Sequence, residues 1–223
     1  MLRIKRIIDL SQNIDSGKYS NPLAPVIKMD ICATHDKNGW MAETIFTGLH
    51  AGTHIDAPIH KIKNGKTVAD YPLQRFHGYG VVVDLFNKEP GSEITAKDLY
   101  KYKKVLKAND IVLLCTGWGN KEKFKEPNDY IYKSPWLGES ACDFLIESKV
   151  NAVGIDHFSI GGMDERNVSV IHEKLLAADI LIFEDLFLPE ILLEKQKWYI
   201  FAFPVFTGNT SGSFARIVAV DFG

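Results

Sequence analysis

The sequence predicts a mixed α/β fold on the basis of three observations. Several short runs rich in Val, Ile and Phe are typical of β-strands. Other segments carry apolar residues at helical spacing. The last two of these helical segments each lie between two strand-like runs, an alternation typical of a parallel sheet covered by helices. Because no Ser/Pro/Gly-rich linker or internal repeat divides the chain, we expect one domain over residues 1–223.

The predicted strands are short and largely apolar, so we expect a central sheet that is buried on both faces. Residues 111–116 show this most clearly, with four consecutive aliphatic side chains before a cysteine. The N-terminal third of the chain reads instead as extended and rich in loops. The predicted strands are residues 3–10, 42–46, 80–86, 111–116, 152–155, 180–183, 198–203 and 214–220.

Each predicted helix has an apolar stripe that can face the sheet. The first helix covers residues 96–106, and Thr95 can cap its N-terminus. The second covers residues 139–148 and the third residues 167–178. The stripes comprise Leu99, Tyr102, Val105 and Leu106 in the first helix, Ala141, Cys142, Leu145 and Ile146 in the second, and Val168, Ile171, Leu175 and Ala178 in the third.

Composition excludes several classes of function. The 223 residues carry a formal net charge of −2, whereas a nucleic-acid-binding protein usually has a basic excess. No apolar run is long enough to span a membrane, and polar residues interrupt the N-terminus too early for a signal peptide. Cys32, Cys115 and Cys142 are widely spaced and form neither a zinc-ribbon pattern nor a disulfide framework. We therefore expect a cytoplasmic protein that has neither a nucleic acid nor a membrane as a partner.

A histidine-rich segment, residues 50–60, carries the clearest chemical signal. Its potential metal ligands, His50, His54, Asp56 and His60, all occupy even positions, while most odd positions are apolar. In extended backbone such residues share one face. Gly52 and Pro58 favour a strand end that runs into a curved loop over an alternative helical turn joining His50 and His54.

Imidazole nitrogen and carboxylate oxygen are suitable ligands for zinc, manganese or iron. Two histidines and one aspartate can hold a metal ion and leave positions for water, which is typical of catalytic rather than structural sites. The alternative interpretation is a row of polar side chains on a solvated edge.

A second candidate cluster lies downstream. His172 falls inside the third predicted helix, and Glu184 follows the predicted strand 180–183. A charged carboxylate that ends a buried strand needs a cation or a metal ion as a partner. Glu184 could also emerge into solvent, an interpretation that the adjacent Asp185 supports.

The segment His50-Ala-Gly-Thr-His54-Ile-Asp56-Ala-Pro-Ile-His60 resembles the HxGTHxDxPxH signature of the cyclase-like metal-dependent hydrolases. This family includes bacterial kynurenine formamidase (arylformamidase) and isatin hydrolase. His172 and Glu184 match the later His and Glu of the family. Weaker matches in the same order cover most of the chain, at residues 8–11, 154–156 and 207–216.

The resemblance implies a fold of the swivelling β/β/α type that assembles as a homodimer or a higher homo-oligomer. It implies that His50, His54 and Asp56 bind one divalent metal ion. It further implies that Asp56, His172 and Glu184 bind a second ion. Zinc is the expected metal, manganese is the alternative, and two ions per subunit are expected.

The resemblance assigns His60 as the general acid/base; the alternative is that His60 is a third metal ligand. The leading prediction is a metal-dependent arylformamidase that converts N-formyl-L-kynurenine and water to formate and L-kynurenine. A hydrolase of cyclic amides such as isatin, a metal-dependent lyase or dehydratase, and a non-catalytic metal-binding module are the alternatives. Substrate-contacting residues stay unassigned: Trp40, Trp118, Trp136 and Phe158 could form an aromatic wall, and Tyr19 and residues 21–25 lie where the formamidases carry aromatic contacts.

Overall fold

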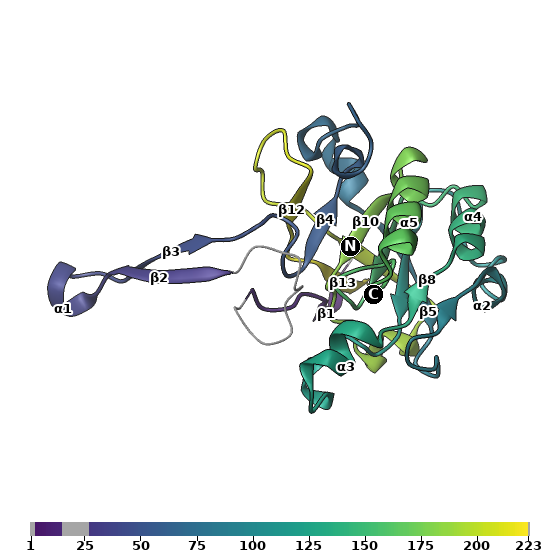
Figure 1. Ribbon diagram of the computed structural model, residues 1–223, viewed down its shortest axis with the longest axis horizontal. Helices are drawn as coiled ribbons and strands as arrows, with labels where there is room; N and C mark the ends of the chain where they lie inside the picture. The colour runs from purple at the N-terminus through teal and green to yellow at the C-terminus, as the bar shows by residue number, and fades with distance from the viewer. Residues whose placement is uncertain (1–2, 15–26, 223) are drawn as a thin grey trace.

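A large mixed sheet dominates the computed structural model, which describes residues 3–14 and 27–222. The described residues form nine hydrogen-bonded strands in the order β1-β13-β11-β5-β7-β9-β10-β4-β12, with helices packed beside them (Figure 1). The predicted α/β class is confirmed. In sheet order the strands are β1 (Ile4–Asp9), β13 (Val218–Phe222), β11 (Lys197–Phe201), β5 (His77–Asp84), β7 (Ile111–Cys115), β9 (Ala152–Ile155), β10 (Leu181–Glu184), β4 (His54–Asp56) and β12 (Gly212–Phe214).

The centre of the sheet is parallel and buried on both faces. Strands β5, β7, β9 and β10 run parallel to one another, and every residue of β7, β9 and β10 is buried. Leu113 and Phe183 pack into a core on one face, whereas Val112 and Ile182 pack into a second core on the other. These strands therefore read as continuous apolar runs without polar alternation.

Two helices cover the second face, as their apolar stripes predict. Leu145 of α4 (Glu139–Glu147) and Leu175 of α5 (Glu165–Ala177) both join the core formed by Val112 and Ile182. Helix α5 begins two residues earlier than predicted. The reason is a cap: the Asp164 carboxylate accepts a hydrogen bond from the Asn167 backbone N–H at 2.8 Å.

The first predicted helix is shorter in the structure than in the sequence-based prediction. Helix α2 (Ala96–Tyr100) has the expected Thr95 cap, but turns replace the helix after Tyr100. The turns bring the buried Tyr102 hydroxyl to the end of β5, where it accepts a hydrogen bond from the Asp84 backbone N–H at 2.8 Å. This tertiary contact, together with the lysine-rich sequence, outweighs the helical periodicity.

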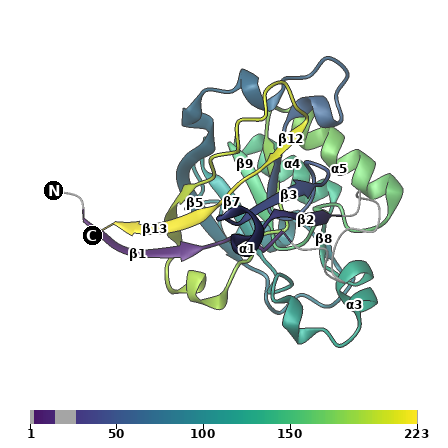
Figure 2. The ribbon, with the colours of Figure 1, turned by 90° about the vertical axis from the view of Figure 1, so that its left-hand side faces the viewer.

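The predicted single strand 214–220 is wrong, because these residues contain the end of one strand and the beginning of another. Strand β12 ends at Phe214 beside β4, and β13 begins at Val218 between β1 and β11. These strands stand near opposite ends of the sheet order, yet only three residues link them. Phe214 and Val218 are four positions apart along the chain and hence at most ~14 Å from each other, so the sheet curls until its two ends approach. Figure 2 shows β1 and β13 side by side at one of these ends.

The N-terminal third contains a hairpin that extends away from the sheet (Figure 1). Strand β3 (Ala42–Phe46) is confirmed, whereas its antiparallel partner β2 (Lys28–Ala33) and the short helix α1 (His35–Asn38) were not predicted. None of the described helices is long and apolar enough to cross a membrane. The remaining elements are β6 (Glu93–Ile94), β8 (Trp136–Leu137), α3 (Pro127–Tyr132) and the 3₁₀ turns Pro58–His60, Val68–Asp70, Leu73–Phe76, Lys121–Lys123 and Glu190–Glu194.

Candidate metal centre

The antiparallel pairing of β4 with β10 joins the two candidate clusters. In this register His54 lies opposite Glu184, and Asp56 lies opposite Ile182. Helix α5 adds His172, so side chains far apart in the sequence meet at one end of the central sheet. The structure brings together all six of the predicted site residues.

The carboxylates of Asp56 and Glu184 lie between the imidazoles of His54 and His172. The Nε2 atom of His54 is 3.3 Å from Asp56 Oδ1 and 3.5 Å from Glu184 Oε2. The Nε2 atom of His172 is 3.3 Å from Glu184 Oε1 and 3.6 Å from Asp56 Oδ2. Each of these four residues is at most 5% exposed. The alternative of a solvated polar edge for residues 50–60 is therefore wrong for His54 and Asp56.

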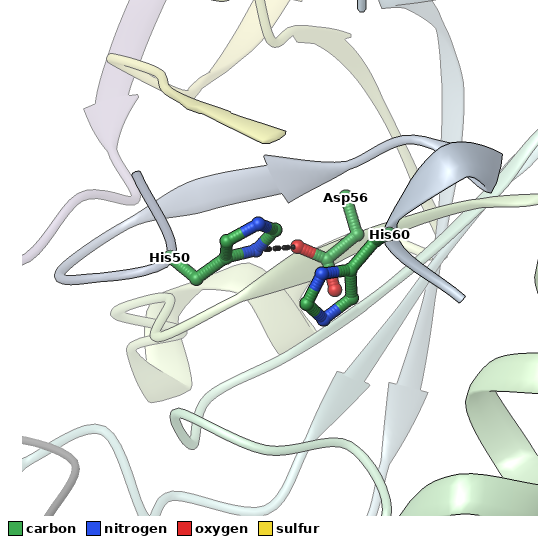
Figure 3. Close-up of side chains that lie close together, drawn as sticks. All are labelled: His50, Asp56 and His60. Atoms are coloured by element: carbon green, nitrogen blue, oxygen red, sulfur yellow. Dashed lines mark hydrogen bonds and ion pairs between the residues drawn. The ribbon is translucent and has the colours of Figure 1, made fainter. Parts of the chain in front are cut away.

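His50 and His60 complete the centre from the two flanks of β4. His50 Nδ1 is 2.7 Å from Asp56 Oδ1. Figure 3 marks this interaction with a dashed line. The exposed His60 lies in the 3₁₀ turn after β4, and its ring stacks on that of His50 with centroids 3.9 Å apart. A strand end that runs into a curved loop is thus confirmed, and the helical alternative for His50 and His54 is wrong.

Backbone carbonyl groups orient two of the imidazoles. His54 Nδ1 lies 2.7 Å from the Gly52 carbonyl oxygen, and His172 Nδ1 lies 2.8 Å from that of Val168. When Nδ1–H donates to a carbonyl, Nε2 of a neutral ring presents its lone pair to the carboxylates. Gly52 has a φ of 63°, a left-handed conformation that glycine adopts without steric strain.

Two further contacts hold the centre and were not predicted from the sequence. The Ile160 backbone N–H donates to Glu184 Oε1 at 2.7 Å, and the Ser211 hydroxyl lies 2.8 Å from His50 Nε2. A backbone donor has no sequence signal. Ser211 belongs to the Gly/Ser-rich segment 207–216, and that resemblance is the signal that could have indicated it.

The carboxylates and imidazoles of the centre shift one another's pKa values. Burial alone would raise the pKa of the Asp56 carboxyl group, but the imidazoles of His172, His50 and His54 hold it well below its usual value. Burial likewise opposes ionisation of Glu184, yet His172 and His54 lower its pKa to about 2. For His172, burial favours the neutral ring, but the two carboxylates raise its pKa to about 10.

The residues present fit a divalent cation. Nε2 of His54 is buried and makes no hydrogen bond within the described residues, although two carboxylates stand near it. Ligand atoms of His54, Asp56 and Glu184 lie within 4.8 Å of one another, as do those of His50, Asp56 and His60. Carboxylate oxygen and imidazole nitrogen are the donors that zinc and manganese accept. A cation there would neutralise both carboxylates and give His54 Nε2 a partner.

The expectation that Asp185 marks an exit into solvent is wrong. Asp185 is 5% exposed and occupies a left-handed conformation with a φ of 53°. Its carboxylate is 2.8 Å from the Lys121 ammonium group and accepts a hydrogen bond from the Tyr130 hydroxyl at 3.0 Å. Glu184 is therefore followed by a second buried and paired carboxylate instead of a residue in solvent.

A cavity of about 410 Å³ opens beside the centre. His60 and His172 line it on the side of the centre, and Phe158, Met163 and Val168 supply apolar surface. Of the four candidate aromatic residues, Phe158 alone lines this cavity. Trp118 is buried against Phe124, Trp136 borders a different cavity, and Trp40 is exposed near the tip of the hairpin. Tyr19 and residues 21–25 lie outside the described residues.

The fold and the centre together define an α/β protein with a histidine–carboxylate site suited to divalent metal ions. The chain belongs to the Cyclase family, whose profile matches residues 8–161. The family resemblance predicted from the sequence is therefore confirmed.

The chain is also similar to individual proteins over nearly its whole length. It is 27% identical over 212 residues to kynurenine formamidase of Bacillus thuringiensis subsp. konkukian, with 95% of each chain covered. It is 26% identical over 218 residues to the Bacillus anthracis kynurenine formamidase, covering 97% of this chain and 98% of that one. The structure of isatin hydrolase A from Labrenzia aggregata superimposes with a TM-score of 0.82 at 23% identity, covering 96% and 93% of the chains. This last likeness confirms the expected fold.

Proposed function

We propose that the protein is a metal-dependent arylformamidase that hydrolyses N-formyl-L-kynurenine to formate and L-kynurenine. The observation that carries the proposal is the buried His54–Asp56–Glu184–His172 cluster beside a partly apolar cavity. The similarity to two Bacillus kynurenine formamidases supports this substrate. The broader class, a hydrolase of carbon–nitrogen bonds other than peptide bonds, is supported by the same relatives and by the family.

The proposed metal ligands divide into two sets that share Asp56. His50, His54 and Asp56 would hold one ion, while Asp56, His172 and Glu184 would hold the other. When bound, a divalent cation supplies Lewis acidity that lowers the pKa of water and polarises a carbonyl oxygen. Zinc is the proposed metal and manganese the alternative. The proposed unit is one domain over residues 1–223.

The chain itself contributes proton transfer and orientation. In the reaction, the oxygen of water bonds to the formyl carbon, the C–N bond breaks, and the aryl nitrogen leaves as an amine. An amine leaves only after it gains a proton. His60 lines the cavity and stacks on His50, and it is proposed to take a proton from the attacking water and deliver it to the leaving nitrogen. The aryl ring would lie against Phe158 and Met163.

A metal-reconstituted activity screen tests this proposal. Protein stripped with a chelator and reloaded with Zn²⁺ or Mn²⁺ should release formate from N-formyl-L-kynurenine, and the metal-free protein should not. Isatin and simple lactams are the comparison substrates. Faster turnover of isatin would favour the cyclic-amide alternative, while conversion without incorporation of ¹⁸O from labelled water would favour a lyase. Tight metal binding without turnover of any amide would contradict the proposal.

A homodimer is the proposed assembly, and the projecting hairpin supports it. Met29, Ile31, Ile45 and Phe46 of the hairpin are 59%, 62%, 50% and 72% exposed. An isolated two-stranded hairpin is only marginally stable in water, and exposed apolar clusters commonly mark interfaces. We propose that this hairpin packs against a second copy of the chain.

Charges placed on the hairpin are therefore expected to disrupt the assembly. The double variant Ile31→Asp/Ile45→Asp should have the mass of one chain by light scattering, whereas the unaltered protein should have the mass of a dimer. Leu73, which is 66% exposed outside the hairpin, provides the control variant Leu73→Asp. A double variant that keeps the dimer mass would contradict the proposed role of the hairpin.

The proposed location is the cytoplasm. Cys32 is an exposed free thiol, and Cys115 and Cys142 are buried free thiols. Unpaired cysteines of this kind are typical of a reducing compartment.

A further inference from the structure

Ser159 has an unusual hydroxyl group. The residue is 8% exposed, and its Oγ makes no hydrogen bond within the described residues. Buried hydroxyl groups in proteins are nearly always hydrogen-bonded, because leaving one without a partner is unfavourable. Because Ser159 lines a cavity while its Oγ is itself buried and unpaired, the hydroxyl is a candidate to turn toward a ligand in that cavity.

The backbone around Ser159 is held from both sides. On one side, its N–H donates to Nδ1 of the buried His157 at 3.3 Å, and His157 Nε2 lies 3.1 Å from the Tyr130 carbonyl oxygen. On the other side, the Ile160 N–H donates to Glu184 in the metal centre at 2.7 Å. The backbone of Ser159 is thus held in place next to Ile160, whose N–H orients the proposed metal ligand Glu184.

Ser159 lines the same cavity as His60, His172 and Phe158. A second serine, Ser169, also lines it, but the Ser169 hydroxyl already accepts a hydrogen bond from Lys61 Nζ at 2.7 Å. Rotation about a single side-chain bond moves the Ser159 hydroxyl between staggered positions without moving the backbone. Such a rotation would turn the hydroxyl toward a polar atom of a molecule bound in the cavity.

We propose that Ser159 binds a ketone oxygen ortho to the scissile amide on an aryl substrate. This inference rests on the proposed function. N-formylkynurenine carries such a ketone beside its formamido group, and isatin carries one at the equivalent position. If the ring packs against Phe158 and Met163 and the amide faces His60 and His172, the ortho substituent would meet the rest of the same cavity lining, to which Ser159 belongs. Ser159 then selects ortho-acyl anilides over plain anilides.

A binding experiment tests Ser159 without depending on turnover. The probes are 2-aminoacetophenone, which retains the ketone, and 2-isopropenylaniline, which replaces the ketone oxygen with a CH₂ group of similar shape. Zinc-loaded protein should bind the ketone about tenfold more tightly, equivalent to ~1.4 kcal/mol. The Ser159→Ala variant should lose this preference, and the matched Ser169→Ala variant should keep it.

The outcomes separate this inference from the proposed function. The role of Ser159 is overturned if the Ser159→Ala variant keeps the ketone preference or loses affinity for both ligands equally. It is also overturned if the unaltered protein shows no preference. A failure to hydrolyse formamides would instead overturn the proposed function, whatever the binding data. Because the hydroxyl is unpaired, Ser159→Ala should leave Tm unchanged or raise it. A clear fall in Tm would show a structural role and would also overturn the inference.

Discussion

Replacement of Asp56 by Asn is expected to abolish both metal binding and hydrolysis. Asp56 is contacted by three histidines, at 2.7 Å from His50, 3.3 Å from His54 and 3.6 Å from His172. It is the residue common to both proposed metal sites, so its amide analogue weakens both at once. Loss of several kcal/mol of metal-derived stabilisation corresponds to a fall in kcat/KM on the order of a thousandfold or more.

Metal content by mass spectrometry and formate release measure the two effects separately. Asp143→Asn is a suitable control, because Asp143 is an exposed acidic residue that pairs with Lys174 on the helical surface. This control should keep full metal content and activity. If Asp56→Asn retains two ions per chain and near-normal turnover, the proposed centre is wrong.

Replacement of His60 by Ala is expected to preserve bound metal and reduce turnover by about 10² to 10⁴, the range typical of general acid–base catalysis. The physical reason is the position of His60, which lines the cavity and stacks on His50 without lying inside the buried cluster. Its removal leaves His54, Asp56, His172 and Glu184 in place. Added imidazole should restore part of the lost activity by entering the vacated space.

The competing role predicts a different result for the same variant. His60 also belongs to a group with His50 and Asp56 whose ligand atoms lie within 4.8 Å of one another. If His60 is a third ligand, His60→Ala will lose metal together with activity. His35, an exposed histidine on the hairpin, supplies the control variant His35→Ala, which should change neither metal content nor turnover.

The sequence determined the two halves of the candidate centre to different degrees. The even spacing of His54 and Asp56 places both side chains on one face of β4, and this follows from the alternation of a strand. The positions of His172 and Glu184 were less well determined by the sequence. The sequence left open whether Glu184 ends its strand in the candidate metal centre or in solvent. The pairing of Asp185 with Lys121 inside the protein, which argues against solvent, has no local sequence signal.

The fold shows the same division. Continuous apolar runs identified the parallel strands, because strands buried on both faces lack polar alternation. Amphipathic stripes identified α4 and α5, because a helix buried on one face has apolar residues at helical spacing. The end of α2 and the break between β12 and β13 were missed. Both depend on contacts with distant segments: Tyr102 reaches β5, and the curl of the sheet brings its two ends together.

By itself, the sequence determined the family, the α/β class and the ligand types of the centre, because these depend on local spacing and residue chemistry. The tertiary structure alone decided that β4 lies beside β10, that His172 reaches both carboxylates, and that Ser159 stands unpaired at the cavity wall. The pairing of β4 with β10, for example, joins segments more than a hundred residues apart. Many alternative pairings satisfy the same local patterns, and only the packing of the whole chain selects one of them.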